Sequence, residues 1–209
     1  MMETSKAFDA YEVIGVITPG TVVGLLLALE WPELRALLGD DGLSLGDFGL
    51  FMVMAFVLGH LVQTLGNLIE EAIARTIGMP TSWVRNPKQG LITPSQRAAL
   101  ITKIEALEGQ PVDATKTSRT HWRSMVMRGY AKVRAAGKSA RIDAFNRTYG
   151  LFRGLSAAFL AAFAWFAFAH PGEQQTLVVL GLLAAASFWR MQRASINYAC
   201  SLIHEFIDL

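Results

Sequence analysis

The sequence predicts an all-α protein with four transmembrane helices and a helical cytoplasmic domain inserted between spans two and three. Two observations lead to this fold class. Of the 209 residues, 52% are hydrophobic and 17% are charged, whereas an ordinary soluble domain carries about 25% charged residues. The apolar residues are also gathered into four uncharged blocks, at residues 13–29, 48–69, 154–169 and 176–189. Burying four such blocks as a soluble core would need a larger polar shell than this chain provides.

The four blocks differ in how well they meet the length of a spanning helix, which is about 20 mostly apolar residues and roughly 17 at the lower end. Residues 48–69 exceed that length, and residues 13–29 only just reach it. The third block reaches it by extending back across Arg153, whose long side chain we expect to snorkel to the interface. The fourth block is short, but apolar residues continue it past Arg190. No small-residue cleavage site follows the first block, so we interpret it as a retained anchor and not as a secretory signal.

The charges of the connecting segments give an independent test of this arrangement. Residues 30–47 contain five acidic residues and one arginine, whereas residues 70–153 contain fifteen Lys or Arg and six acidic residues. Basic loops stay on the cytoplasmic side of a membrane. We therefore expect a multi-pass protein of the bacterial inner membrane, in contact with the lipid bilayer, with both termini cytoplasmic.

Four segments follow from hydropathy and charge together. We expect an N-terminal transmembrane hairpin at residues 1–69 and a basic helical cytoplasmic domain at 70–150. A C-terminal transmembrane hairpin is expected at 151–190, and a cytoplasmic amphipathic helical tail at 191–209.

In the first span, Phe8 and Tyr11 are placed as interfacial aromatic residues. Pro19 and Gly20 fall inside the span, where proline removes a backbone donor and kinks a helix. The pair is interpreted either as a hinge or as a simple packing kink. A short interfacial turn around residues 31–38 and a Gly/Asp turn after it are expected in the outer loop.

The cytoplasmic segment carries clear helix boundary signals. Thr93, Pro94 and Gln96 form a capping-box start, and Gly109 ends that helix. A second helix is expected from about residue 120 to 136, with Gly137 after it. A third begins near residue 139 and continues unbroken into the third span. The last twenty residues keep helical periodicity and continue the fourth span.

No signature of an enzyme is present. The sequence has no glycine-rich phosphate loop, no G-x-S-x-G elbow and no H-E-x-x-H motif. It has a single cysteine, Cys200, and its four histidines lie in separate segments. We therefore expect no catalysis, no cofactor and no metal, and we rank an enzyme acting on lipid or nucleotide third among the hypotheses.

The sharpest feature is a polar stripe in the second span. On a helix that advances 100° per residue, four polar residues fall within an arc of about 60° and two more lie at its edge. The four are His60, Thr64, Asn67 and Glu71, and the edge residues are Gln63 and Glu70. Gly59 and Gly66 flank the stripe and would let another backbone approach closely. Either the stripe joins helices by hydrogen bonds of roughly 0.6 to 2 kcal/mol each, or it lines the inner mouth of a pore shared by several subunits.

The middle segment also contains a dense run of basic residues. They are Arg119, Arg123, Arg128, Lys132, Arg134, Lys138, Arg141 and Arg147. The plainest interpretation is the positive bias of any cytoplasmic segment, reinforced by anionic headgroups at about 1 kcal/mol per basic residue. Docking of a cytoplasmic protein partner is the main alternative, and we do not expect direct nucleic-acid binding.

At three places the chain resembles a group of uncharacterised bacterial membrane proteins. The stretches are FDAYEVIGVITPG from residue 8, GHLVQTLGNLIEEAIARTIGMPTSW from residue 59 and FNRTYGLFRG from residue 145. In architecture the chain is also similar to membrane effectors of bacterial phage-defence systems, in which a cytoplasmic sensor is thought to trigger membrane permeabilisation. That second resemblance rests on architecture and not on a shared motif.

The hypothesis from the sequence is therefore a homo-oligomeric pore-forming or membrane-perturbing effector that is controlled through its cytoplasmic domain, with a role in anti-phage defence. His60, Gln63, Thr64 and Asn67 would line the pore. The alternative is a non-conducting membrane anchor or scaffold that recruits a cytoplasmic partner enzyme.

Overall fold

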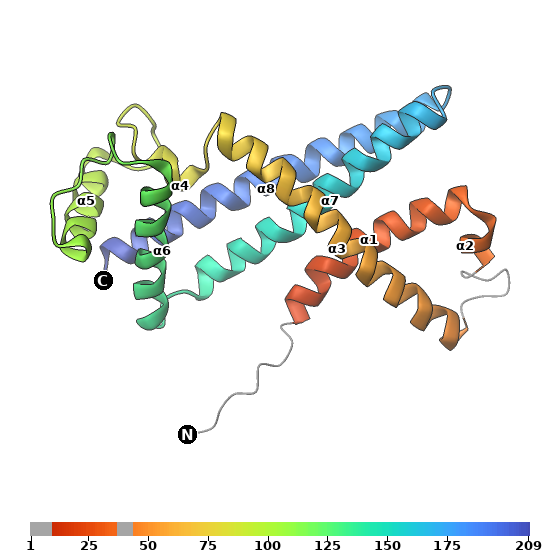
Figure 1. Ribbon diagram of the computed structural model, residues 1–209, viewed down its shortest axis with the longest axis horizontal. Coiled ribbons are helices and arrows are strands. Elements are labelled where there is room, and N and C mark those ends of the chain that lie inside the picture. The colour runs from red at the N-terminus through yellow and green to blue at the C-terminus, as the bar shows by residue number, and fades with distance from the viewer. Residues whose placement is uncertain (1–9, 37–43) are drawn as a thin grey trace, which may run out of the picture. The chain divides into compact units, whose positions relative to one another are not determined.

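The computed structural model describes residues 10–36 and 44–209 (Figure 1). In these two ranges the chain forms eight helices and no strand, which confirms the all-α prediction. The helices are α1 (Ala10–Glu30), α2 (Pro32–Ala36), α3 (Leu45–Thr76), α4 (Pro80–Trp83), α5 (Pro94–Glu108), α6 (Arg119–Ala135), α7 (Ala140–Ala169) and α8 (Gln174–Ile207). Phe8 and the expected Gly/Asp turn of the outer loop lie outside the described residues.

The chain divides into two compact units. The first comprises Met1–Glu71 and Arg147–Met191, and the second comprises Ala72–Asn146 and Gln192–Leu209. Helices α3, α7 and α8 each begin in one unit and end in the other.

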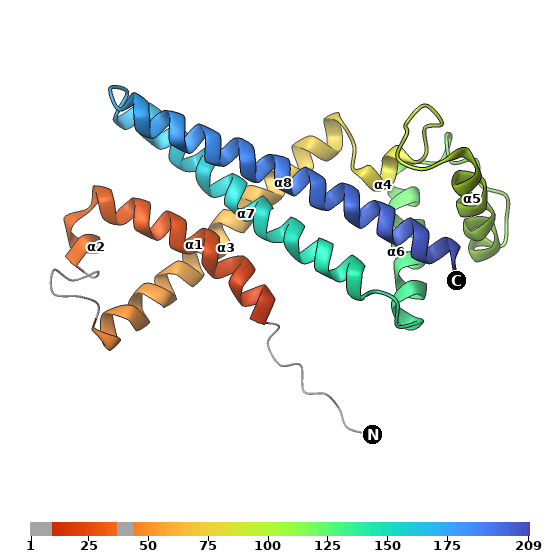
Figure 2. The same cartoon turned by 180° about the vertical axis from the view of Figure 1, so that it is seen from behind.

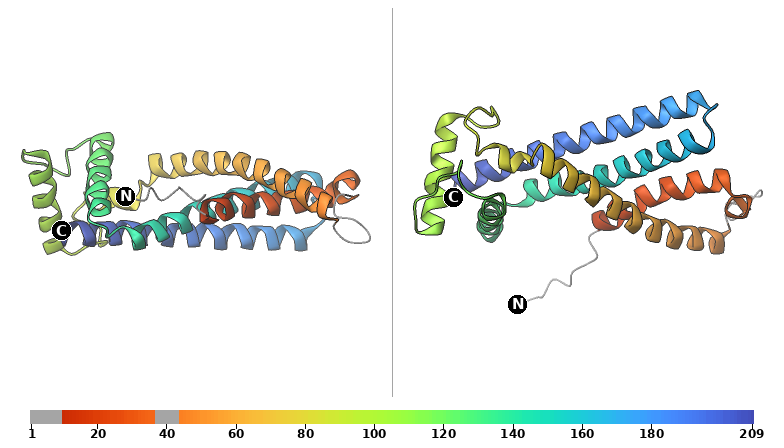
Figure 3. Two further views of the ribbon diagram at one scale, coloured as in Figure 1. Left: turned by 90° about the horizontal axis from the view of Figure 1, so that it is seen from below. Right: turned by 45° about the horizontal axis from the view of Figure 1, so that its top comes forward.

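Within the first unit, α1 crosses α3 at very short distance (Figures 1 and 3). A Cβ atom added to Gly20 would lie 1.8 Å from the backbone oxygen of Ala55, and one added to Gly59 would lie 2.1 Å from that of Val16. Only glycine permits such an approach, because any side chain at these positions would overlap the facing backbone.

The first unit also contains the helical hairpin of α7 and α8, which run side by side (Figure 2). Ala162, Phe166 and Leu180 form a small buried cluster between them. A second cluster is formed by Val62 of α3 with Ala157 and Ala158 of α7. The alanines of α7 in these two clusters therefore allow α3 and α8 to pack closely against it.

Two helices among the described residues are long and apolar enough to cross a membrane. They are α3 with its continuation, Leu45–Trp83, and α7, whereas the apolar part of α1, Gly15–Glu30, is shorter. Length and composition therefore do not confirm the prediction of four spans.

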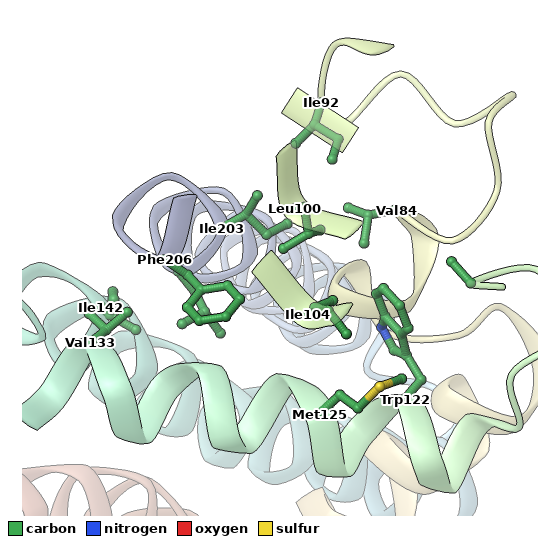
Figure 4. Packing of buried hydrophobic residues seen from close by; sticks show 12 residues of the cluster. Val84, Ile92, Leu100, Ile104, Trp122, Met125, Val133, Ile142, Ile203 and Phe206 are labelled. Atoms are coloured by element: carbon green, nitrogen blue, oxygen red, sulfur yellow. The ribbon is translucent and has the colours of Figure 1, made fainter. Parts of the chain in front are cut away.

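The second unit has a hydrophobic core of its own (Figure 4). Trp122 and Met125 of α6, Ile104 of α5 and Ile142 of α7 are almost completely buried in it, and Phe206 of α8 packs among them. The Trp122 indole N–H donates to the Thr81 backbone oxygen at 2.8 Å, so the largest buried side chain of this core keeps its polar atom paired.

The predicted helix boundaries of this unit are confirmed. The Thr93 side chain accepts a hydrogen bond from the Gln96 N–H while the Gln96 side chain accepts one from the Thr93 N–H. Gly109 and Gly137 follow their helices with φ of 70° and 74°, a left-handed conformation that glycine adopts at low cost. Helices α7 and α8 are also continuous, as the sequence predicts.

Candidate functional site

A polar cluster joins three helices inside the first unit. Nε2 of Gln63 on α3 donates to the backbone oxygen of Gly15 on α1 at 3.0 Å and to that of Gly150 on α7 at 3.2 Å. Oε1 of the same Gln63 side chain accepts from Nη2 of Arg153 at 3.2 Å. One glutamine therefore links α1, α3 and α7 through both ends of its amide.

Arg153 completes this cluster with an ion pair. Its Nη1 lies 2.5 Å from Oε2 of Glu70, and the two side chains are 21% and 28% exposed. The guanidinium carbon also lies 5.8 Å from the centroid of the Tyr149 ring. We expected Arg153 to snorkel outward, but it pairs within the bundle because α3 presents an acceptor carboxylate and amide to it.

The rest of the stripe faces away from this cluster. His60, Thr64, Asn67 and Glu71 are all exposed in the single chain, whereas Gly59, Val62 and Gly66 of the same helix are buried. The Thr64 hydroxyl donates to the His60 backbone oxygen at 3.0 Å. The His60 ring meets the Phe56 ring edge-on at 4.6 Å between centroids. The six residues of the predicted stripe thus separate into an inward pair and an outward row of four.

A hydrogen-bonded side-chain pair also lies at the opposite end of the unit. Nε2 of His170, just after α7, lies 3.0 Å from Oε2 of Glu30 at the end of α1. The intervening residues 154–169 of α7 carry no charge. At a rise of 1.5 Å per residue, Arg153 and His170 are separated by about 26 Å, which is close to the thickness of a bilayer's hydrocarbon core, about 30 Å.

The remaining residues predicted for packing lie at helix contacts. Pro19 is buried within the continuous helix α1, and a Cβ atom on Gly154 of α7 would lie 2.8 Å from its Cγ. A Cβ atom on Gly66 would lie 3.1 Å from Cγ of Arg153. The proline ring thus fills the space left by a glycine on the neighbouring helix.

Several of the predicted basic residues bond within the second unit. Arg119 donates to the backbone oxygens of Ala74 and Arg75 at 3.3 and 3.1 Å, Arg128 pairs with Glu108, and the Lys138 ammonium lies 3.5 Å from the Asp208 backbone oxygen. Arg141 lies over the Phe145 ring, and Arg147 also has an interaction partner. These five therefore have structural contacts and are not simply a charged surface.

The other three basic residues lie on α6 and are exposed. Arg123, Lys132 and Arg134 point away from the face of α6 that carries Trp122 and Met125 into the core. If the second unit receives a partner, these side chains are accessible cations on one helix for it to contact.

Sequence reasoning missed the role of Arg153. The available signal was that Arg153 is a lone charge between apolar stretches, while Gln63 and Glu70 lie at the stripe edge nearest the glycines. A charge next to a spanning segment needs a polar partner, and the stripe edge was the nearest source of one.

Among the described residues, no three His, Cys, Asp or Glu side chains are grouped to hold a metal ion. A cavity of about 20 Å³ in the core of the second unit is lined mainly by apolar residues such as Leu100, Met125 and Phe206. That volume holds at most about one water molecule.

Comparison of the chain with protein-family models, curated proteins and solved structures found no match. The class of the protein therefore rests on its own features. Its described residues are all-helical, with two helices of membrane-spanning length and composition and a second unit that has its own hydrophobic core.

Proposed function

We propose that this chain is a subunit of a homo-oligomeric membrane pore, and that the outward row of α3 lines the aqueous path. The observation that carries the proposal is the exposure of His60, Thr64, Asn67 and Glu71 on a helix that is long and apolar enough to span a bilayer.

Residence in a membrane is supported by the surface of the first unit. Only 22% of the most apolar part of Leu45–Trp83 and 33% of that of α7 are buried, whereas the core helix of a soluble protein is mostly buried. Large apolar side chains are exposed on all four long helices of this unit. Examples are Leu29, Leu61, Phe168 and Leu182. Exposure of so large an apolar surface is unfavourable in water, whereas contact of the same surface with lipid acyl chains is not.

Four spans fit the helix lengths of this unit. Helix α1 has 21 residues, about 32 Å at 1.5 Å per residue, so it reaches across the hydrocarbon core although its apolar part is short. The apolar first half of α8 is paired with α7 in the hairpin. The two polar pairs, Glu30–His170 and Glu70–Arg153, would then mark the two boundaries of the bilayer, with the basic second unit on the cytoplasmic side.

In this placement the outward row extends from the middle of the bilayer at His60 to its cytoplasmic boundary at Glu71. His60 is ten residues before Glu70, about 15 Å along α3, and therefore near the middle of the bilayer. Polar side chains at this depth face a water-filled path or another protein surface. A second copy of the chain beside α3 would provide either one, which is why we propose a homo-oligomer.

Dye leakage from liposomes tests the pore. Purified chain is reconstituted as wild type, His60→Leu, Asn67→Leu and, as a matched control on the same helix outside the row, Leu61→Val. We expect leakage from wild type and Leu61→Val and several-fold slower leakage from the two stripe variants. Equal leakage from all four proteins, or none from wild type, contradicts the pore.

A non-conducting anchor or scaffold is the second candidate function. The observation that favours it is the exposure of Arg123, Lys132 and Arg134 on a unit with its own core, which could bind an acidic surface of a cytoplasmic enzyme. In that case the row on α3 would join subunits by hydrogen bonds. His60→Leu and Asn67→Leu would then reduce the mass of the detergent-solubilised oligomer, and wild-type liposomes would not leak.

Control of the pore through the second unit, and a role in anti-phage defence, are further parts of the proposal. They depend on what binds the exposed cations of α6. A nuclease or nucleotide cyclase encoded beside this chain would support them.

A further inference from the structure

One face of α8 is covered by large apolar side chains and ends in an arginine. Val178, Val179, Leu182, Leu183 and Trp189 are each between 41% and 65% exposed. On a helix that advances 100° per residue they lie, together with Arg190, within an arc of about 140°. The opposite face carries Leu180, Ala184 and Met191, which are buried, so this exposed face is the outer surface of the α7–α8 hairpin.

Arg190 is held beside this face by an aromatic contact. Its guanidinium carbon lies 5.9 Å from the centroid of the Phe152 ring on α7, within the range of a cation–π interaction. A guanidinium carries its N–H donors in its own plane, and Arg190 is an exposed residue. Arg190 is therefore positioned and can still donate hydrogen bonds at its edge.

The dimensions of the face match one leaflet of a bilayer. Val178 and Arg190 are twelve residues apart, about 18 Å along the helix, and half of a hydrocarbon core is about 15 Å. The order along α8 is aliphatic residues, then a tryptophan, then a cation. A phospholipid has the complementary order of acyl chain, interface and phosphate, and guanidinium groups bind phosphate through paired N–H donors.

We propose that this face of α8 binds an anionic phospholipid, with an acyl chain along Val178, Leu182 and Trp189 and the headgroup phosphate at Arg190. Charge complementarity selects an anionic lipid, because a zwitterionic headgroup carries its own cation next to the phosphate. The proposal rests on the membrane residence proposed above and adds a lipid class and a binding residue to it.

Fluorescence quenching in vesicles tests this site. The full chain is reconstituted into phosphatidylcholine vesicles that contain a fixed minor fraction of brominated lipid, either phosphatidylglycerol or phosphatidylcholine. The quenching of Trp189 is taken as the difference between wild type and Trp189→Phe. Arg190→Gln removes the proposed phosphate ligand, and Lys116→Gln, at an 86% exposed residue of the second unit, is the matched charge control.

We expect brominated phosphatidylglycerol to quench Trp189 more strongly than brominated phosphatidylcholine at the same bulk fraction. The difference should correspond to an enrichment of phosphatidylglycerol beside Trp189 of about fivefold. This factor is equivalent to the interaction of one basic residue with an anionic surface, about 1 kcal/mol. Arg190→Gln should lower this enrichment to about one, and Lys116→Gln should leave it unchanged.

Equal quenching by the two lipids in wild type, or an undiminished preference in Arg190→Gln, overturns the site. Flotation of the vesicles in a density gradient distinguishes failure of the lipid site from failure of the proposed membrane residence. A chain that does not float with either vesicle contradicts the membrane residence itself, and a chain that floats without a lipid preference contradicts only the site on α8.

Discussion

At the scale of residues, Gln63, Glu70 and Arg153 form a cross-helix network of charged and amide side chains in the first unit. The Glu70 carboxylate pairs with the Arg153 guanidinium. The Gln63 amide accepts from Arg153 and donates to two backbone oxygens. Removing one member leaves a polar group of its partner without that hydrogen bond in a partly buried place, which costs more than the bond itself contributes.

Arg153→Met should therefore destabilise the protein by about 2 kcal/mol, since Glu70 and Gln63 lose a charged partner in a site that solvent still reaches in part. Thermal unfolding in detergent measures the change. Lys116→Gln is the control and should shift stability by less than about 0.5 kcal/mol. Adding Glu70→Met to Arg153→Met should recover part of the loss, and simple additivity of the two substitutions would contradict the pairing.

Tyr130 should make the stability of the second unit depend on pH in the alkaline range. Its hydroxyl donates to Oδ1 of Asp143 at 2.5 Å, and this bond, with a smaller contribution from burial, raises the pKa of Tyr130 from 10.0 to about 12. Ionisation would destroy the bond and place two negative charges side by side. Because the folded pKa is above the unfolded one, the stabilisation is complete below about pH 10 and is lost between pH 10 and 12.

The free energy of unfolding should therefore fall between pH 10 and 12 in wild type, and phenolate absorbance should report the late ionisation of Tyr130. Tyr130→Phe should cost about 1–2 kcal/mol at neutral pH and show a smaller decline over that pH range. An identical decline in both proteins would exclude Tyr130 as its source.

At the scale of elements, the contact between α1 and α3 depends on glycine. Elsewhere both helices carry larger side chains, some of which are exposed, such as Leu29 and Leu61. At Gly20 and Gly59, however, backbone meets backbone. The same close approach brings the backbone oxygen of Gly15 within reach of Gln63, so helix packing and the polar cluster support each other.

Gly59→Ala should separate α1 from α3 and destabilise the protein by about 1–3 kcal/mol, because the new methyl group would overlap the Val16 backbone oxygen. Gly49→Ala on the same helix is the control. No atom lies within 4 Å of a Cβ atom at that position, so alanine there should be neutral or stabilise by up to about 1 kcal/mol. Denaturant or thermal unfolding compares the two, and an equal effect of both would contradict the close packing.

At the scale of the whole molecule, helices α3, α7 and α8 connect the two units without interruption. Most of the exposed large apolar side chains belong to the first unit, and the hydrophobic core of Figure 4 belongs to the second. The proposed control of the pore through the second unit would use these continuous helices as its connection.

The four-span arrangement makes a prediction for the whole chain that labelling can check. In a Cys200→Ser background, Ser44→Cys should react with a membrane-impermeant maleimide from outside intact cells, because residue 44 precedes α3 at the outer boundary. Ser124→Cys, on an exposed position of α6, should react only after the membrane is opened. Labelling of both from outside would contradict the proposed topology.

The sequence by itself determined the elements of this protein. The Thr93 capping box and the glycines after α5 and α6 are local signals, and these two helices begin and end close to where the signals predict. Each uncharged block lies within a helix, although α1 and α3 extend beyond the block at both ends. The sequence also identified the stripe on α3, because helical periodicity alone brings His60, Thr64, Asn67 and Glu71 to one face.

Only the tertiary structure decided which part of the stripe is inside. Gln63 and Glu70 lie at its edge by periodicity, but whether that edge faces inward depends on where α1 and α7 cross α3. Those crossings are set by contacts between residues far apart in the chain, such as Gly59 with Val16 and Glu70 with Arg153. Periodicity describes one helix at a time, and a partner on another helix is a property of packing.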